Sequence, residues 1–415
     1  MDLGLSPEEA VAAWPQGVAL GVLWSGGAVC ERNRWIVLGA LGPETDWPEG
    51  GLREGAAGAL PFCGGWIGVL EYEFGAEIEP RAGRGGGRAR WWRCEDALVF
   101  DRAERRWWAV GNPPELGRAE RGSFVVGEIA PGGGDWGEAR RAYEAGVARV
   151  LEYIRAGDVY QVSLTHRLCA AFEGSARAFF LALCAAAEPW YGALVEAGDG
   201  VVCSASPELF LSFDPGTGRV VTRPMKGTRP RTAGREELAL AAKDSAELNM
   251  ITDLMRNDLG RVCEIGSVRV DVAREVEAHA VGEAGLWQAT ATVSGLLRRG
   301  VDVRGLMAAT FPGGSVTGAP KIRAMQIISE LEREVRGVYC GAVGCVSRGG
   351  HAAFNVAIRT AAIAGGILRY GVGAGIVAES DPQAEWRETL DKAGVLMRAA
   401  QPGTVEVKGQ VGATR

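Results

Sequence analysis

Two pairs of carboxylates stand three residues apart in stretches whose apolar spacing predicts helices. Asp244 and Glu247 belong to the first stretch, and Glu385 and Glu388 belong to the second, so each pair projects from one helical face. Two facing helices of this kind would suit Mg²⁺, which proteins hold with one or two carboxylates together with water and an anionic substrate. Solvated helix surface is the alternative interpretation of either pair alone.

A lysine in a cationic setting is the second chemical feature. The stretch "VTRPMKGTRPR" places Lys226 among arginines and directly before Gly-Thr. An amine is nucleophilic only when neutral, and the cations Arg223, Arg229 and Arg231 would favour the neutral form if they pointed into the same site. An exposed lysine in a turn is the alternative.

Composition limits what these residues can belong to. The chain has 415 residues, 47% apolar content and a net charge of −6, which indicates a globular protein of two or three domains without a basic field for nucleic acid or anionic lipid. No apolar run approaches the roughly 18 residues that span a bilayer, and the N-terminus carries acids where a secretion signal carries positive charge. Nine cysteines without a C-x-x-C pair favour free thiols. We therefore expect a cytoplasmic protein.

The elements that must position these residues are strands joined by hairpins, with helices placed irregularly between them. A loop at 130–137 marks a plausible boundary, and a turn at 216–218 predicts a hairpin. This order favours an α+β fold with large antiparallel or mixed sheets. Helices are expected at 143–157, 236–257, 320–335 and 383–399, and strands at 159–168, 200–213, 218–227, 341–348, 351–363 and 366–377.

Seven long motifs, in order and spacing, resemble the chorismate-utilising enzymes. The resemblance covers about residues 138–400, and "PFCGGWIGVLEYEFG" at 61–75 extends it toward the N-terminus. The motifs are "GDVYQVSLTHR", "SASPELFL", "RPMKGTRPR", "SAELNMITDLMRNDLGRV", "FPGGSVTGAPKIRAMQIISELE", "AFNVAIRT" and "GAGIVAESDPQAEWRETLDKA".

The family resemblance implies the anthranilate-synthase-like fold, in which two large, mostly antiparallel sheets pack as a sandwich with helices outside. In this interpretation residues 1–130 form an N-terminal subdomain that contributes strands to one interlaced unit. Residues 138–400 form the chorismate-binding catalytic region, and 401–415 form a polar C-terminal tail.

Two positions distinguish the branches of the family. Gln161 stands where members that add water to chorismate carry a lysine general base, and because an amide cannot activate water, ammonia is the expected nucleophile. Lys226 occupies a position that is normally alanine in anthranilate synthases and lysine in aminodeoxychorismate synthases. The resemblance therefore implies synthesis of 4-amino-4-deoxychorismate, a precursor of 4-aminobenzoate and folate. An anthranilate synthase and a non-catalytic chorismate-binding subunit are the alternatives.

The resemblance also implies a role for each candidate residue. Mg²⁺ would be held by Glu247 and Glu388, supported by Asp244 and Glu385. Glu208 would protonate the departing C4 hydroxyl of chorismate, and Lys226 would add at C2. The expected substrate-binding residues are Gly227, Thr228, Tyr339, Arg359, Gly373, Gly375 and Lys392.

Two further expectations concern partners and a departure from the family pattern. The sequence shows no glutaminase signature, so the resemblance implies that ammonia comes from a separate glutamine amidotransferase subunit, component II. Gln288 stands where many relatives carry a histidine, and the three histidines, 166, 279 and 351, are expected to be structural.

Overall fold

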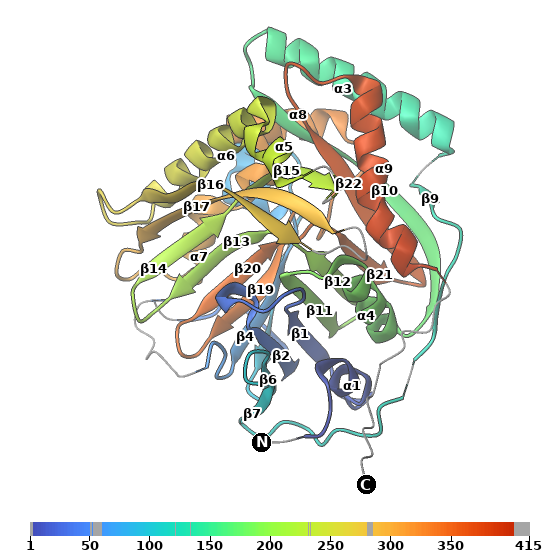
Figure 1. Ribbon diagram of the computed structural model, residues 1–415, viewed down its shortest axis with the longest axis vertical. Helices are drawn as coiled ribbons and strands as arrows, with labels where there is room; N and C mark the ends of the chain where they lie inside the picture. Colours follow the sequence, from blue (N-terminus) through green and yellow to red (C-terminus); the bar gives the residue numbers. More distant parts are fainter. Residues whose placement is uncertain are drawn as a thin grey trace.

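The computed structural model describes residues 3–49, 52, 60–120, 122–132, 134–230, 232, 234–279 and 285–401, and it consists of two large antiparallel sheets with helices outside (Figure 1). Within these residues one sheet has twelve strands and the other has ten, which confirms the expected fold class. We call the larger sheet A and the smaller sheet B.

Sheet A follows the order β18-β10-β22-β21-β12-β11-β1-β2-β6-β7, and β8 and β9 also pair with β10. Its strands are β1 (Leu20–Trp24), β2 (Trp35–Ala40), β6 (Ala97–Asp101), β7 (Arg106–Val110), β8 (Phe124–Val126), β9 (Ala130–Pro131), β10 (Gln161–Gly174), β11 (Tyr191–Ala197), β12 (Gly200–Ser206), β18 (Gly318–Ala319), β21 (Thr360–Ala364) and β22 (Ile367–Ile376).

Sheet B follows the order β15-β17-β14-β13-β20-β19-β4-β5-β3, and β16 also pairs with β17. Its strands are β3 (Glu44–Thr45), β4 (Gly65–Leu70), β5 (Ala89–Cys94), β13 (Leu209–Asp214), β14 (Arg219–Arg223), β15 (Met225–Pro230), β16 (Arg269–His279), β17 (Leu286–Leu296), β19 (Ala342–Ser347) and β20 (Ala352–Val356).

The helices cover the sheets from outside. Helices α3, α4 and α9 lie against sheet A, and α5 and α6 lie against sheet B (Figure 1). The helices are α1 (Pro7–Ala12), α2 (Phe74–Ile78), α3 (Trp136–Arg155), α4 (Ala176–Ala187), α5 (Arg235–Leu240), α6 (Ala242–Gly260), α7 (Val303–Thr310), α8 (Lys321–Leu331) and α9 (Pro382–Ala399). No helix in these ranges is both long and apolar enough to cross a membrane.

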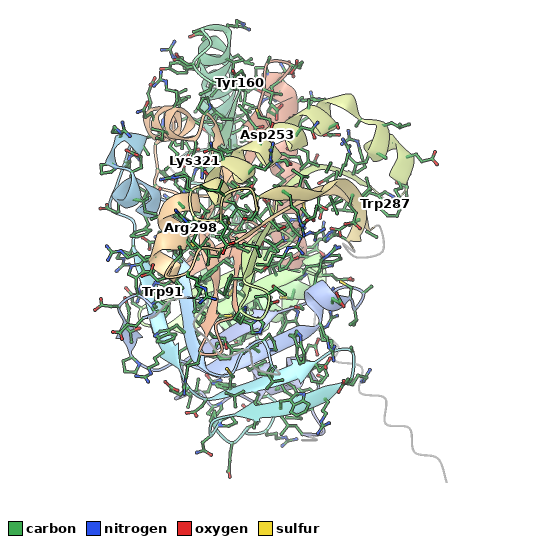
Figure 2. All side chains as sticks on the ribbon, turned by 90° about the vertical axis from the view of Figure 1, so that its left-hand side faces the viewer. Trp91, Tyr160, Asp253, Trp287, Arg298 and Lys321 are labelled. Carbon is green, nitrogen blue, oxygen red and sulfur yellow. The ribbon has the colours of Figure 1, made fainter. Side chains whose placement is uncertain are left out.

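The first 110 residues contribute strands to both sheets. Strands β1, β2, β6 and β7 extend sheet A, whereas β4 pairs with β19 of sheet B, so that Gly65 lies opposite Ser347. Trp91 of β5, labelled in Figure 2, is completely buried and meets Phe354 of β20 edge to face at 5.9 Å. The N-terminal part therefore shares its core with the C-terminal part.

Two strands expected from the sequence are each divided between the sheets. The stretch 200–213 forms β12 in sheet A and β13 in sheet B, with the crossing at Pro207 and Glu208. The stretch 351–363 forms β20 in sheet B and β21 in sheet A, and Arg359 at this second crossing has a φ of 51°. Apolar alternation reports burial but not the sheet to which a strand belongs, and Pro207 lacks the N–H that would continue a ladder.

The two crossings are hydrogen-bonded to each other. The Val356 N–H donates to the Glu208 carbonyl at 3.1 Å, and the Ala205 N–H donates to the Arg359 carbonyl at 3.0 Å. Glu208 and Arg359, both expected to act on substrate, therefore lie on two segments that are hydrogen-bonded to each other.

Two helix predictions need correction as well. The helix expected at 236–257 is broken at Ala241, where ψ is 105°, into α5 and α6. The helix expected at 320–335 ends at Leu331 because the backbone of Glu332 is extended, with a ψ of 125°. Further along, the Arg336 N–H donates to the Glu73 carboxylate at 2.6 Å. The hairpin turn at 216–218 is confirmed between β13 and β14.

Candidate active site

Three predicted residues meet where β10 and β22 of sheet A face β15 of sheet B. A Cβ atom on Gly375 would lie 2.8 Å from Lys226 Nζ and 3.1 Å from Gln161 Nε2, so the missing side chain leaves the space into which both groups point. Neither polar atom of the Gln161 side chain has a hydrogen-bond partner within the described residues, although both are buried. Buried polar atoms without partners are rare in proteins and mark a place where a ligand can bind.

Lys226 faces a carboxylate rather than free cations. Its Nζ lies 4.0 Å from Glu247 Oε2, and the two side chains are only 15% and 14% exposed. Arg223 donates to Glu277 at 2.9 Å and Arg229 donates to Asp244 at 2.8 Å, so both positive charges are paired with carboxylates. The expected cluster of arginines around Lys226 is therefore wrong for these two. Arg231 lies outside the described residues.

Glu208 has the properties of a general acid. Its side chain is buried at the first sheet crossing, and burial raises the pKa of the carboxyl to about 7, against the opposing effects of a hydrogen bond to Ser315 and the charge of Lys226. A carboxyl that keeps its proton near neutral pH can donate it to a leaving group. Sequence reasoning did not identify Ser315, although its stretch, "GGSVTGAPK", belongs to one of the seven motifs that carry the family resemblance.

The two acid pairs lie on α6 and α9, as the sequence predicts. Burial raises the pKa of Glu247, and the negative charges of Asp244 and Glu388 add to this effect, which places the two helices within electrostatic reach of each other. Glu385 is buried and accepts a hydrogen bond from Ser380 at 2.6 Å. Glu388 pairs with Lys392 at 2.7 Å.

These carboxylates can hold Mg²⁺ only together with ligands from a bound substrate. Within the described residues no three His, Cys, Asp or Glu side chains form a group that could hold a metal by themselves. Glu247 and Glu388 offer hard oxygen donors from two facing helices, and Lys226 and Lys392 are the cations beside them. Coordination of Mg²⁺ by one or two carboxylates, water and an anionic substrate needs no more protein ligands than this.

Along about half of its length, one side of β22 is not paired with the neighbouring strand β21. Strand β21 pairs with β22 only from Ile367 to Tyr370, whereas β10 pairs with it as far as Ile376. Lys392 Nζ donates to the Gly373 carbonyl at 2.8 Å on this stretch. Gly373 is buried with its carbonyl bound by Lys392, whereas Gly375 is half-buried, so Gly375 is the more accessible of the two to a bound molecule.

Arg359 and Tyr339 provide the groups expected for a substrate carboxylate. Burial lowers the pKa of the Arg359 guanidinium, which forms no hydrogen bond or ion pair with any described residue. The Tyr339 ring lies on Gly371, where a Cβ would be 2.1 Å from the ring. Arg359 is half-buried, and an arginine partly removed from water without a counter-charge is poised to bind an anion.

The remaining predicted residues have structural contacts. Gly227, with a φ of 86°, lies beneath Asp244, since a Cβ there would be 2.9 Å from Asp244 Cγ. Thr228 is exposed and lies opposite Gln288 in the pairing of β15 with β17. Gln288 is buried and its Oε1 has no hydrogen-bond partner among the described residues.

Comparison with known proteins gives the family. The model of the chorismate binding enzymes matches residues 43–398. Aminodeoxychorismate synthase component 1 from Klebsiella aerogenes is 35% identical over 81% of this chain and 77% of its own length. Aminodeoxychorismate synthase from Streptomyces griseus is 44% identical over 59% of this chain, which spans only 34% of that longer protein. The solved structure of anthranilate synthase component I from Streptococcus pneumoniae TIGR4 has a TM-score of 0.74 and 27% identity, and it covers 94% of this chain and 96% of its own.

Proposed function

Because the chain belongs to the chorismate binding enzymes, we propose that it is the synthase subunit that converts chorismate and ammonia to 4-amino-4-deoxychorismate, in the cytoplasm and in the route to 4-aminobenzoate and folate. The observation that carries this proposal is the position of Lys226, whose Nζ points with the Gln161 amide into the space beside Gly375. The relatives named aminodeoxychorismate synthase support the same reaction.

The proposed chemistry uses Lys226 and Glu208 in one step and ammonia in the next. The Lys226 amine adds to C2 of chorismate, the ring double bonds shift, and the C4 hydroxyl leaves as water with the proton of Glu208. Ammonia then adds to C4, the double bonds shift back, and the lysine amine is expelled from C2. The overall reaction exchanges the hydroxyl for an amino group and releases one water.

Two groups of residues would bind the two negatively charged carboxylates of chorismate. Arg359 and Tyr339 would bind the side-chain carboxylate, and Lys392 would hold the neighbouring backbone at Gly373. Glu247 and Glu388, supported by Asp244 and Glu385, would hold Mg²⁺, which when bound neutralises the ring carboxylate.

The product identifies the reaction. Purified protein with chorismate, an ammonium salt and Mg²⁺ should form 4-amino-4-deoxychorismate, which keeps its enolpyruvyl group, as measured by liquid chromatography and mass spectrometry. Anthranilate with released pyruvate would instead assign the activity of the solved Streptococcus pneumoniae relative. Glutamine should replace ammonium only when a glutamine amidotransferase subunit is added.

The lysine can be tested separately. When wild type meets chorismate without ammonia, the peptide that contains Lys226 should gain mass, and Lys226→Ala should lose this adduct while it still binds chorismate. Lys226→Arg is the matched control, because it keeps the charge but cannot act as the nucleophile. If Lys226→Ala made aminodeoxychorismate at the wild-type rate, Lys226 would not be the nucleophile and the proposed mechanism would be wrong.

A further inference from the structure

A cavity of about 550 Å³ lies apart from Lys226, between α3, β10 and the segment 331–339. It occupies a gap in the edge of sheet A, where β18 pairs with β10 at 161–162 and β9 pairs with it at 168–169, leaving 163–167 uncovered by either strand. Of the predicted active-site residues, only Tyr339 lines it. The cavity is therefore a separate space that shares one wall with the candidate active site.

The sequence of α3 explains why this space exists. The helix presents Ala139, Ala142, Ala145 and Gly146 to the cavity. Protein interiors are normally packed without voids larger than a water molecule, and side chains this small cannot fill the gap between a helix and a strand. A space of this volume, lined mainly by apolar groups, is typical of a small-molecule site.

The charges around the cavity are balanced except for one. Eight of the lining residues take part in five ion pairs, which are Arg167 with Glu334 at 2.6 Å, Arg336 with Glu332 at 2.7 Å, Arg333 with Glu138 at 3.5 Å, Arg149 with Glu152 at 2.5 Å and Glu71 with Arg88 at 3.9 Å. Arg369 also lines the cavity, and its guanidinium has no hydrogen bond or ion pair with any described residue. The unmatched charge is a single positive one.

The opposite part of the lining is apolar and aromatic. Tyr143 and Leu164 line it together with His166, whose Nε2 contacts the Thr389 hydroxyl at 2.9 Å and whose ring stacks on Trp386 at 4.8 Å. Burial lowers the pKa of His166 to about 4, so the ring is neutral at physiological pH. The cavity therefore combines one free cation with a neutral, ring-sized surface.

We propose that this cavity is a second small-molecule site, which binds a monocarboxylate with a planar or ring-shaped apolar body. Arg369 would bind the carboxylate, and the surface formed by Tyr143, Leu164 and His166 would cover the ring. This inference does not depend on the reaction proposed above.

Benzoate is a suitable probe, with benzamide as its uncharged control. Trp386 stacks on His166, so tryptophan fluorescence reports occupancy, and calorimetry gives the affinity. Because benzoate could also enter the candidate active site, titrations are made with saturating chorismate and Mg²⁺ in the Glu208→Gln variant, which keeps the proposed metal and carboxylate sites. We expect saturable binding of benzoate and none of benzamide at the same concentrations.

Two pairs of variants locate the site. Ala142→Leu fills the cavity and should abolish binding, whereas Ala148→Leu, at an equally exposed position of α3 that does not line the cavity, should not change it. Arg369→Gln should weaken binding about tenfold or more, as expected for loss of a charge-assisted hydrogen bond, and Arg369→Lys should retain part of the affinity. Equal affinity in both leucine variants, or complete displacement of benzoate by chorismate, would show that the cavity is not the site.

Discussion

Polar groups have complete hydrogen bonds in one region of the molecule and lack partners in another. In the segment after α8, Arg336 donates to Glu332 and to the carbonyls of Val316 and Ser163 at 2.6–2.9 Å, and Glu73 accepts the N–H groups of Arg336 and Gly337. In the candidate active site, the buried Gln161 has no partner for either polar atom among the described residues, and the half-buried Arg359 pairs with none of them.

The presence or absence of hydrogen-bond partners separates polar groups that stabilise the fold from polar groups that are available to bind a ligand. A buried group whose hydrogen bonds are complete stabilises one conformation, because any rearrangement leaves it unsatisfied. A buried group without a partner costs stability and retains the capacity to bind something else. Variants in the first region should change stability, and variants in the second should change activity.

The largest effect on activity is expected at the acid pairs. Glu388→Ala should lower kcat/KM by about 10³-fold or more, since a metal-supported charge interaction is worth several kcal/mol. Activity of the wild type should disappear with a chelator and return with Mg²⁺. Circular dichroism should show an unchanged fold, and full turnover in the presence of chelator would disprove the proposed metal dependence.

The next effect is expected at the first sheet crossing. Glu208→Gln keeps the shape of the side chain but removes the proton, and it should reduce kcat roughly 10²- to 10⁴-fold, as expected for the loss of a general acid. The lysine adduct should also be lost because the hydroxyl cannot leave. A variant that kept the wild-type kcat would show that another group supplies the proton.

Variants in the segment after α8, where the buried hydrogen bonds are complete, should change stability and leave activity nearly unchanged. Arg336→Met leaves the Glu332 carboxylate buried without its partner and should lower the free energy of unfolding by about 3–5 kcal/mol. The double variant Arg336→Met/Glu332→Met removes both charges and should recover much of that loss. Folded protein measured at low temperature should retain kcat within a few-fold, and a loss of kcat equal to that of Glu208→Gln would contradict the comparison.

The smallest effect is a dependence on pH. Since the general acid must be protonated, kcat should fall as pH rises through about 7, the value to which burial raises the pKa of Glu208. A raised carboxyl pKa also means that stability is lost as pH rises from the ordinary value of 4.5 through about 7. The Tm difference between Glu208→Gln and wild type should therefore grow from pH 5 to pH 8 in favour of the variant.

Local patterns in the sequence predicted much of the site. The spacing of Asp244 and Glu247, and of Glu385 and Glu388, follows from helical periodicity alone, and both pairs lie on helices. The strand expected at 218–227 does contain Lys226, but it is divided into β14 and β15, and β15 continues through Gly227 and Thr228 to Pro230.

What the sequence could not show is which elements meet. The two sheet crossings were interpreted as continuous strands, since an uninterrupted apolar stretch looks the same whether it stays in one sheet or changes to the other. The pairing of Arg223 with Glu277 joins residues 54 positions apart, and no local pattern indicates it. The cavity beside α3 was missed because small residues on a helix face predict close packing as readily as empty space.

The interlaced strands have a consequence for how the chain acquires its structure. Strand β4 finds its partner β19 with Gly65 opposite Ser347, and β1 is hydrogen-bonded to β11 with Leu20 opposite Glu196. Contacts between residues so far apart require the entropy of closing long loops before any pairing is gained, which slows folding. A nascent chain that lacks β19 to β22 has a gap in the interior of both sheets, so the space beside Gly375 is assembled only after nearly the whole polypeptide has been synthesised.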